Sequence, residues 1–123
     1  MPFVDDFMNR NIIKIKSGQT GLDAAIFMTK NKVSSLLVVN NDNIVGIITE
    51  KDLIRKVVAL NQNINTVTVE SFMSSPILYI KSNSTLRECV LMMKENKVNH
   101  LVVSSNDQVL GIITLSDILP FMI

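Results

Sequence analysis

The feature that most constrains this chain is a repeat, because the second half restates the first half without an insertion. The pattern Gly-Ile-Ile-Thr-x-x-Asp begins at Gly46 and begins again at Gly111. When these two glycines are aligned, identical residues recur in one register along the first copy from Phe7 to Asp52. A shared composition would not keep one register over so many positions, so we expect two copies of one structural unit.

Each copy has the pattern of strand, helix, strand, strand and helix. Short β-branched runs between turn formers indicate strands, and a Thr-x-x-acid sequence before apolar residues at helical spacing indicates the start of a helix. The expected strands are residues 12–15, 36–39, 44–48, 77–80, 101–103 and 109–113. The expected helices begin at Thr20, Thr49, Thr85 and Thr114. Pro120 should end or kink the last of them, because proline lacks the backbone N–H.

These elements predict an α+β fold of two β-α-β-β-α repeats. We expect residues 1–60 to form the first repeat and residues 69–123 the second. Residues 61–68 are polar and are expected to link the two repeats, which together make one compact module.

Composition limits the class of protein. The chain has 123 residues, is 47% hydrophobic and has a mean hydropathy of +0.32, so apolar surface is expected to meet a partner. No apolar run approaches the ~18 residues of a membrane span, and the start lacks the pattern of a signal peptide. A single cysteine excludes an internal disulfide and favours the cytoplasm. A net charge of +1 with few aromatic residues argues against a nucleic-acid partner.

The Thr-x-x-acid sequences have two interpretations. All four suit a capping box, which contributes about 1 kcal/mol per helix. The second and fourth also follow Gly46 and Gly111, which lie within apolar strands. Glycine is unfavourable there unless a backbone or a ligand comes close. The threonine hydroxyl can donate to a phosphate, and the aspartate can accept hydrogen bonds from the vicinal hydroxyls of a ribose, so capping and ligand binding both stay open.

The doubled pattern of glycine, apolar pair, threonine and aspartate resembles a pair of cystathionine β-synthase (CBS) domains. The resemblance runs from Phe7 to Leu119 and includes the motif in both copies. It implies repeats related by a pseudo-twofold axis, with small mixed sheets packed together and helices outside. It also implies clefts between the repeats that bind adenine nucleotides or, in some members, S-adenosylmethionine.

The resemblance also implies roles for individual residues. Asp52 and Asp117 would bind ribose hydroxyls, and Thr49 and Thr114 would face a phosphate. Apolar residues would flank the base, namely Ile12, Ile13, Ile77 and Leu78. The motif glycines Gly46 and Gly111 complete the expected ligand-binding set.

Few residues near the motifs could neutralise a phosphate. Several nucleotide-binding relatives carry Arg or His at two positions that here are residues 34–35 and 99–100, where only His100 can carry a charge. His100 is either a phosphate contact or a neutral residue at the start of a strand. Lys51, beside the first motif, is either a phosphate contact or a solvated helix residue, and Ser116 takes its place in the second copy.

The sequence therefore predicts a regulatory sensor that binds AMP, ADP or ATP, with no covalently bound cofactor, catalytic residue or metal site. The alternative of another class is a ligand-free scaffold for dimerisation or for docking on an effector protein; S-adenosylmethionine is the alternative ligand. Apolar residues on the second helices and at residues 119–123 predict a homodimer. Cys89 lies among helical core positions and is expected to be a packing residue, not a nucleophile.

Overall fold

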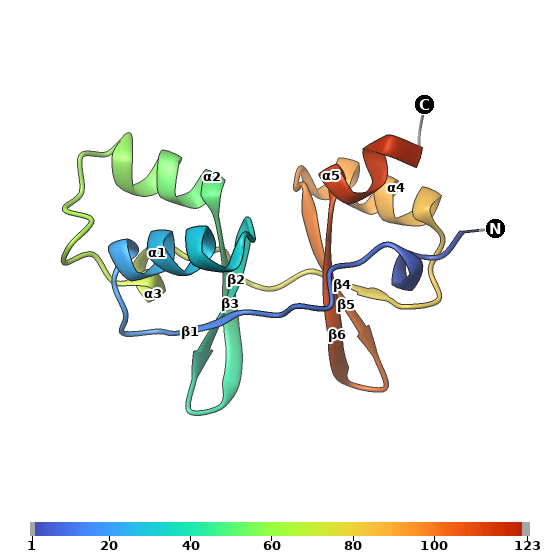
Figure 1. Ribbon diagram of the computed structural model, residues 1–123, viewed down its shortest axis with the longest axis horizontal. Helices are drawn as coiled ribbons and strands as arrows, with labels where there is room; N and C mark the ends of the chain where they lie inside the picture. The colour runs from blue at the N-terminus through green and yellow to red at the C-terminus, as the bar shows by residue number, and fades with distance from the viewer. Residues whose placement is uncertain (1, 122–123) are drawn as a thin grey trace. The chain divides into compact units, whose positions relative to one another are not determined.

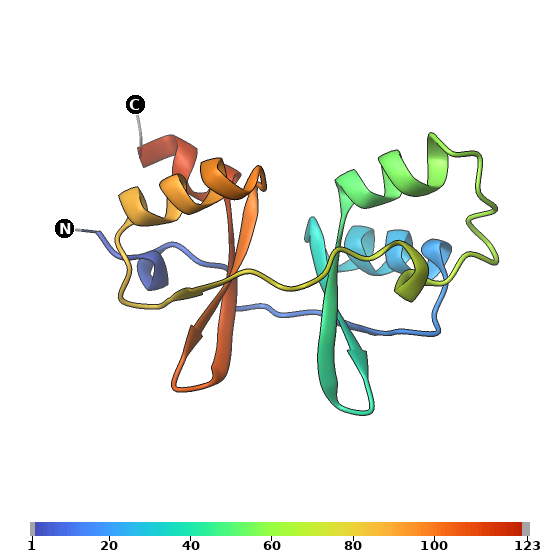
Figure 2. The ribbon, with the colours of Figure 1, turned by 180° about the vertical axis from the view of Figure 1, so that it is seen from behind.

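The computed structural model describes residues 2–121, which form two compact units (Figures 1 and 2). The first unit is Ile13–Ile77. The second unit joins the N-terminal segment, residues 2–12, to the chain from Leu78 onward. Met122 and Ile123, part of the apolar terminus in the sequence, lie outside the described residues.

The first unit contains a three-stranded mixed sheet in the order β1-β2-β3. β1 (Lys14–Lys16) is parallel to β2 (Ser35–Asn40), and β2 is antiparallel to β3 (Asn43–Thr49). α1 (Gly21–Asn31) joins the parallel pair. Residues 41–42 form the hairpin turn with positive φ angles, which asparagine and aspartate tolerate better than most residues.

Three further elements complete the first unit. β3 leads into α2 (Glu50–Asp52), which continues as the π-helix η2 (Leu53–Val58), and α3 (Val69–Phe72) follows the loop after η2. The helices lie on one face of the sheet (Figures 1 and 2). The core between helices and sheet consists of Ile15, Ala24, Met28, Leu36, Val38, Ile48, Leu53, Val57, Val69 and Phe72.

The second unit repeats this sheet in the order β4-β5-β6. β4 (Tyr79–Lys81) is parallel to β5 (His100–Ser105), which is antiparallel to β6 (Gln108–Thr114). α4 (Leu86–Asn96) joins the parallel pair. The β5–β6 turn at residues 106–107 has the same positive φ angles as the turn of the first unit.

The second unit ends its helical layer differently. α5 (Leu115–Ile118) is followed by the 3-10 helix η3 (Leu119–Phe121), and a further 3-10 helix, η1 (Val4–Asp6), comes from the N-terminal segment. The core consists of Val4, Met8, Ile80, Cys89, Met93, Leu101, Val103, Ile113 and Ile118. The early change of helix type before Pro120 agrees with the expectation that proline would end a regular helix there.

The predicted order of strand, helix, strand, strand and helix is confirmed in both copies, but the first strands begin at other residues than predicted. The first strand of each copy begins two residues later than predicted, at Lys14 and Tyr79. One backbone hydrogen bond lies just before each of these strands. The Ile13 carbonyl accepts from Leu37 N–H, and the Leu78 carbonyl accepts from Val102 N–H, each at 3.0 Å. One isolated bond does not make a strand.

Each of the two segments that precede a sheet in sequence packs against the sheet of the other copy. The connecting segment, residues 68–77, precedes the second sheet in sequence but belongs to the first unit, where Ser74 and Ile47 exchange two backbone hydrogen bonds of 2.8 and 3.0 Å. The N-terminal segment precedes the first sheet but belongs to the second unit, where Asn9 and Ile112 exchange the same pair. The structural units therefore cross the boundaries of the sequence repeats.

No helix within residues 2–121 combines the length and the apolar character that crossing a bilayer requires.

Candidate functional site

Three of the four Thr-x-x-acid sequences form the full predicted capping box, and the fourth forms one side of it. At Thr20, Thr49 and Thr85 the acid three residues later accepts the threonine N–H, and the threonine hydroxyl accepts the N–H of the acidic residue. In the fourth, Asp117 accepts from the N–H and the hydroxyl of Thr114 at 2.8 and 3.0 Å. The capping interpretation is therefore confirmed, and it fixes the orientation of both motif carboxylates.

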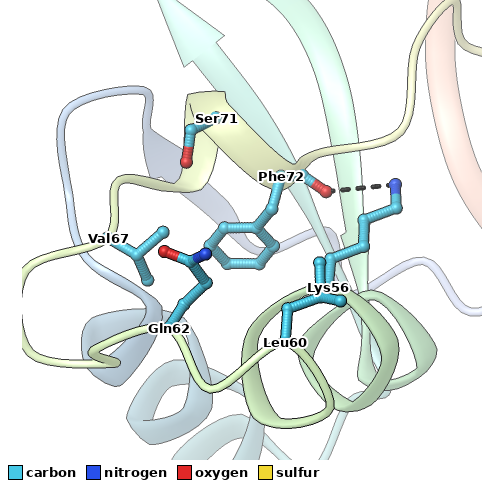
Figure 3. Close-up of a pocket in the computed structure, with 6 residues that line it drawn as sticks. All are labelled: Lys56, Leu60, Gln62, Val67, Ser71 and Phe72. Carbon is cyan, nitrogen blue, oxygen red and sulfur yellow. Dashed lines mark hydrogen bonds between the residues drawn. The ribbon is translucent and has the colours of Figure 1, made fainter.

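In the first unit the motif aspartate lies within a network of four donors. Asp52 Oδ2 accepts from the N–H and the hydroxyl of Thr49 at 3.0 and 3.1 Å. Asp52 Oδ1 accepts from Ser74 Oγ at 2.9 Å and forms an ion pair with Lys56 Nζ at 3.1 Å. Lys56 Nζ also donates to the carbonyl of Phe72 at 3.2 Å (Figure 3). The carboxylate ties helix η2 to the connecting segment.

In the second unit the equivalent carboxylate is more open. Asp117 is half-buried, whereas Asp52 is only 6% exposed. His100, at the start of β5, is the direct partner of Thr114 in the β5–β6 ladder, which places one predicted phosphate contact next to the motif. Ser116, in the first turn of α5, is exposed.

The motif glycines lie where another backbone crosses the strand. A methyl group on Gly46 would be 3.1 Å from the carbonyl oxygen of Ser74. A methyl group on Gly111 would be 2.7 Å from the carbonyl oxygen of Asn9. Of the two reasons that the sequence offered for these glycines, the close approach of a backbone is confirmed. Contact with a ligand stays a prediction.

The residues expected to flank the base are divided between the units in an order that the sequence did not suggest. Ile13 and Ile77 belong to the unit that contains the first motif, and Ile12 and Leu78 belong to the unit that contains the second. All four are half-buried. Lys51, in α2, is exposed.

The two residues that contact Asp52 Oδ1, Lys56 and Ser74, were not predicted from the sequence. Lys56 could have been found, because it lies four residues after Asp52 on the predicted helix, a spacing at which opposite charges meet. Ser74 could not have been found this way, since the connecting segment reaches Asp52 only through the fold.

Two open cavities lie in the first unit. One, of about 410 Å³, is lined by Lys56, Leu60, Gln62, Val67, Ser71 and Phe72 (Figure 3). The ammonium group of Lys56 reaches the Phe72 carbonyl, and its methylene chain lines the cavity. The other, of about 590 Å³, lies at residues 16–19 and 39–42. Within residues 2–121 no three His, Cys, Asp or Glu side chains are grouped as metal ligands would be.

Comparison with known proteins gives concordant results. A family model described as "CBS domain" matches residues 4–59 and 69–123. An uncharacterized protein of Methanopyrus kandleri is 30% identical over 98% of this chain, which spans 64% of that relative's length. An uncharacterized conserved protein of Pyrococcus horikoshii has a similar crystal structure, with a TM-score of 0.90, 28% identity and coverage of 98% of this chain and 92% of that chain. A hexameric CBS-CP12 protein from bloom-forming cyanobacteria has a TM-score of 0.90 and 26% identity, with coverage of 97% of this chain and 70% of that chain.

Proposed function

Since this chain belongs to the CBS-domain family, we propose that it is a regulatory module that binds an adenosine-containing ligand, with AMP, ADP or ATP as the first candidates. Tandem CBS domains are in general regulatory and ligand-binding, not catalytic. We also propose that it acts in the cytoplasm.

The observation that carries the proposal is the half-buried carboxylate of Asp117. Its own capping box holds it in one orientation at the end of β6, with Thr114 bonded to Oδ2 only. A carboxylate fixed in this way can accept two hydrogen bonds from adjacent hydroxyls without losing side-chain entropy on binding. The Thr114 hydroxyl, which donates to Asp117 Oδ2 without ligand, would turn to donate to a phosphate when the ligand binds, and His100 is the partner of Thr114 in the β5–β6 ladder.

The basic lining favours a ligand with few phosphate groups. Of the residues named as phosphate contacts, the exposed Lys51 carries a positive charge, His100 can gain one only by protonation, and the two belong to different units. A monophosphate needs less neutralisation than a triphosphate, so we rank AMP before ATP.

The experiment is a thermal-shift and calorimetry panel of AMP, ADP, ATP, NAD and S-adenosylmethionine, with GMP as the control for the base. A ligand at ~100 times its dissociation constant should add about 2.7 kcal/mol to the free energy of unfolding. Thr114→Val, which removes the hydroxyl and keeps the shape, should weaken AMP more than adenosine. A panel without any shift at millimolar concentration contradicts the proposal.

The exposed apolar residues of the second helices favour a second candidate, a scaffold for self-association. Ile54, Val58 and Leu60 are 61%, 66% and 63% exposed on and after η2, and Leu119 and Phe121 are 49% and 62% exposed on η3. Surface of this kind is often covered by a partner, and the cyanobacterial CBS-CP12 relative is a hexamer. We propose a homodimer that can also dock on an effector protein. Light scattering that gives 13.7 kDa at micromolar concentrations would contradict self-association.

A further inference from the structure

The carboxylate of Asp52 has no acceptor position left for a ligand. An ionised carboxylate offers about four lone-pair positions to donors. Asp52 Oδ2 accepts two bonds from Thr49, Oδ1 accepts one from Ser74, and the Lys56 ammonium group forms an ion pair at Oδ1, all at 2.9 to 3.1 Å. A ribose hydroxyl can therefore bind Asp52 only if it displaces one of these donors.

The carboxylate of Asp117 keeps two such positions. Its Oδ2 accepts from the N–H and the hydroxyl of Thr114, and no other residue from 2 to 121 donates to it. The Oδ1 atom is left with two lone-pair positions, which is the number that two adjacent hydroxyls need. The two copies of the motif are thus chemically different although their motif threonine and aspartate are the same.

The difference has its origin at two positions where the copies do not match. Phe121 stands where the first copy has Lys56, and Asn9 stands where the first copy has Ser74. The Phe121 ring packs edge-on against Phe7 with ring centroids 4.4 Å apart. The Asn9 side chain accepts a hydrogen bond within its own turn, from the backbone two residues later. Neither side chain supplies a donor to the second aspartate.

Displacing a donor from Asp52 is unfavourable for an electrostatic reason. The Asp52 side chain is 8% exposed, so its charge has lost most of its water and depends on Lys56 for compensation. Separating a buried carboxylate from its cation leaves an uncompensated charge. A neutral hydroxyl that replaced Lys56 would not restore that compensation.

We propose that Asp52 is a structural tie between η2 and the connecting segment, and that only the Asp117 motif takes the adenosine ligand, so that each chain binds one. Lys56 and Ser74 are then the residues that close the first motif. This inference rests on the proposed function, which it deepens by assigning the ligand to one motif.

The test is calorimetry of the full chain with AMP, supported by thermal unfolding. We expect one AMP per wild-type chain. Asp117→Asn should weaken AMP at least tenfold, because a charged acceptor of the ribose is lost. Lys56→Met and Ser74→Ala should leave the affinity of the wild-type site within about twofold, because both residues lie in the other unit. Asp52→Asn should likewise retain one AMP.

Thermal unfolding without ligand tests the structural tie separately. Asp23→Asn is the matched control, because Asp23 makes the backbone bonds of a capping box and no ion pair is seen at it among residues 2–121. Asp117→Asn should lower the melting temperature about as much as this control. Asp52→Asn should lower it about twice as much, and together with Lys56→Met it should lower it by less than the sum of the single changes. If Asp52→Asn does not fold, Ser74→Ala tests the tie in its place, because it removes only the neutral hydrogen bond from Ser74 to Asp52 and should still lower the melting temperature.

Several results would overturn the inference. Two AMP molecules of similar affinity per wild-type chain would do so, as would a tenfold loss of AMP affinity in Asp52→Asn or, if that variant does not fold, in Ser74→Ala. Equal melting temperatures for the Asp52→Asn and Asp23→Asn variants would contradict the proposed structural role of Asp52. Failure of the wild type to bind AMP, ADP, ATP or S-adenosylmethionine would reject the proposed function itself, and the wild-type titration alone identifies that case.

Discussion

Among single residues, Cys89 gives a prediction about pH. Its side chain is fully buried in the core of the second unit, and this burial raises the pKa of the thiol from 9.0 to about 11. Between these values the unfolded chain has lost the thiol proton and the folded chain still holds it. The folded state therefore binds more protons there, and the free energy of unfolding falls as the pH rises.

The expected loss is on the order of 1–2 kcal/mol between pH 9 and pH 11. Urea unfolding at pH 8.5, 9.5 and 10.5 measures it. Lysine and tyrosine groups titrate in the same range, so Cys89→Ala is the control: it is less stable throughout, but its stability should fall less steeply. Equal slopes for the two proteins would contradict the prediction.

Gly111 and Gly46 should respond differently to the same small change. In Gly111→Ala the new methyl group meets a backbone oxygen, that of Asn9, at 2.7 Å, and a backbone cannot move aside easily. In Gly46→Ala the nearest atoms belong to the flexible side chain of Met73. We expect a loss of about 1–3 kcal/mol for Gly111→Ala and a smaller one for Gly46→Ala.

Gly18 supplies the matched control, because nothing lies within 4 Å of a methyl group built there. Gly18→Ala should change the free energy of unfolding by less than about 0.5 kcal/mol. Urea unfolding of the three variants measures the order. A Gly46→Ala variant less stable than Gly111→Ala would show that the side chain, not the backbone, sets the limit.

At this scale the sequence was informative where the partners are local. The capping boxes could be predicted, because threonine and acid lie three residues apart in all four. The contact between Ser74 and Asp52 could not be predicted, because it joins residues far apart in sequence. The split of the base-flanking residues between units was missed for the same reason.

At the scale of elements, the two second helices differ in backbone hydrogen bonding. Bonds of the π-helix type close η2, with Ala59 N–H donating to the carbonyl of Ile54 at 2.8 Å and Gln62 N–H donating to that of Val57 at 2.9 Å. Its counterpart is short, because α5 gives way to a 3-10 turn that contains Pro120. The position of Pro120 is occupied by Arg55 in the first copy.

A proline at the equivalent position of the first copy, Arg55, should therefore destabilise the first unit. Arg55→Pro removes a backbone donor from the interior of the helix that runs from Glu50 to Val58, and this should cost about 3 kcal/mol. Arg55→Ala is the control, because the Arg55 side chain is exposed and alanine suits a helix. Circular dichroism and urea unfolding compare them. Equal stability of the two variants would mean that η2 tolerates the loss of its hydrogen bond.

Long periodic elements could be predicted from the sequence, and short turns of helix could not. α1 and α4 have capping boxes and an apolar face, and both begin directly after the predicted threonines, Thr20 and Thr85. α3 and η1 have four and three residues, too few for a helical period to be visible. The π-helix was also missed, since the apolar spacing of residues 50–60 suits an ordinary helix.

At the scale of the whole molecule, the grouping of segments predicts which fragment can fold. Residues 13–77 contain every member of the first core. Residues 1–60, the first sequence repeat, lack Val69 and Phe72 and carry Val4 and Met8, which belong to the other core. Loss of a large buried side chain such as Phe72 costs about 3–5 kcal/mol, which a unit of this size cannot spare.

We therefore expect the 13–77 fragment to unfold cooperatively in urea and to give dispersed amide NMR signals, and the 1–60 fragment to do neither. The two fragments are nearly equal in length, so each controls for the effect of size on the other. Cooperative unfolding of the 1–60 fragment would contradict the grouping.

The repeat itself could be predicted from the sequence. The packing of each segment against the sheet of the other copy, called here the exchange of the segments, could not. Phe7 and Met8 of the N-terminal segment match Phe72 and Met73 of the connecting segment in the alignment of the copies. Either segment offers an aromatic ring and a thioether to either core, so the pattern of apolar residues is the same with and without exchange.

The exchanged segments set an order of events on the ribosome. The N-terminal segment is synthesised first, yet the backbone to which Val4 donates, at Ser84, follows only after the whole first repeat. At about 5–20 residues per second the segment stays without its core for several seconds, while residues 13–77 already have theirs. Residues 13–77 should therefore fold first, and the N-terminal segment should pack only when the chain from Leu78 onward has been made.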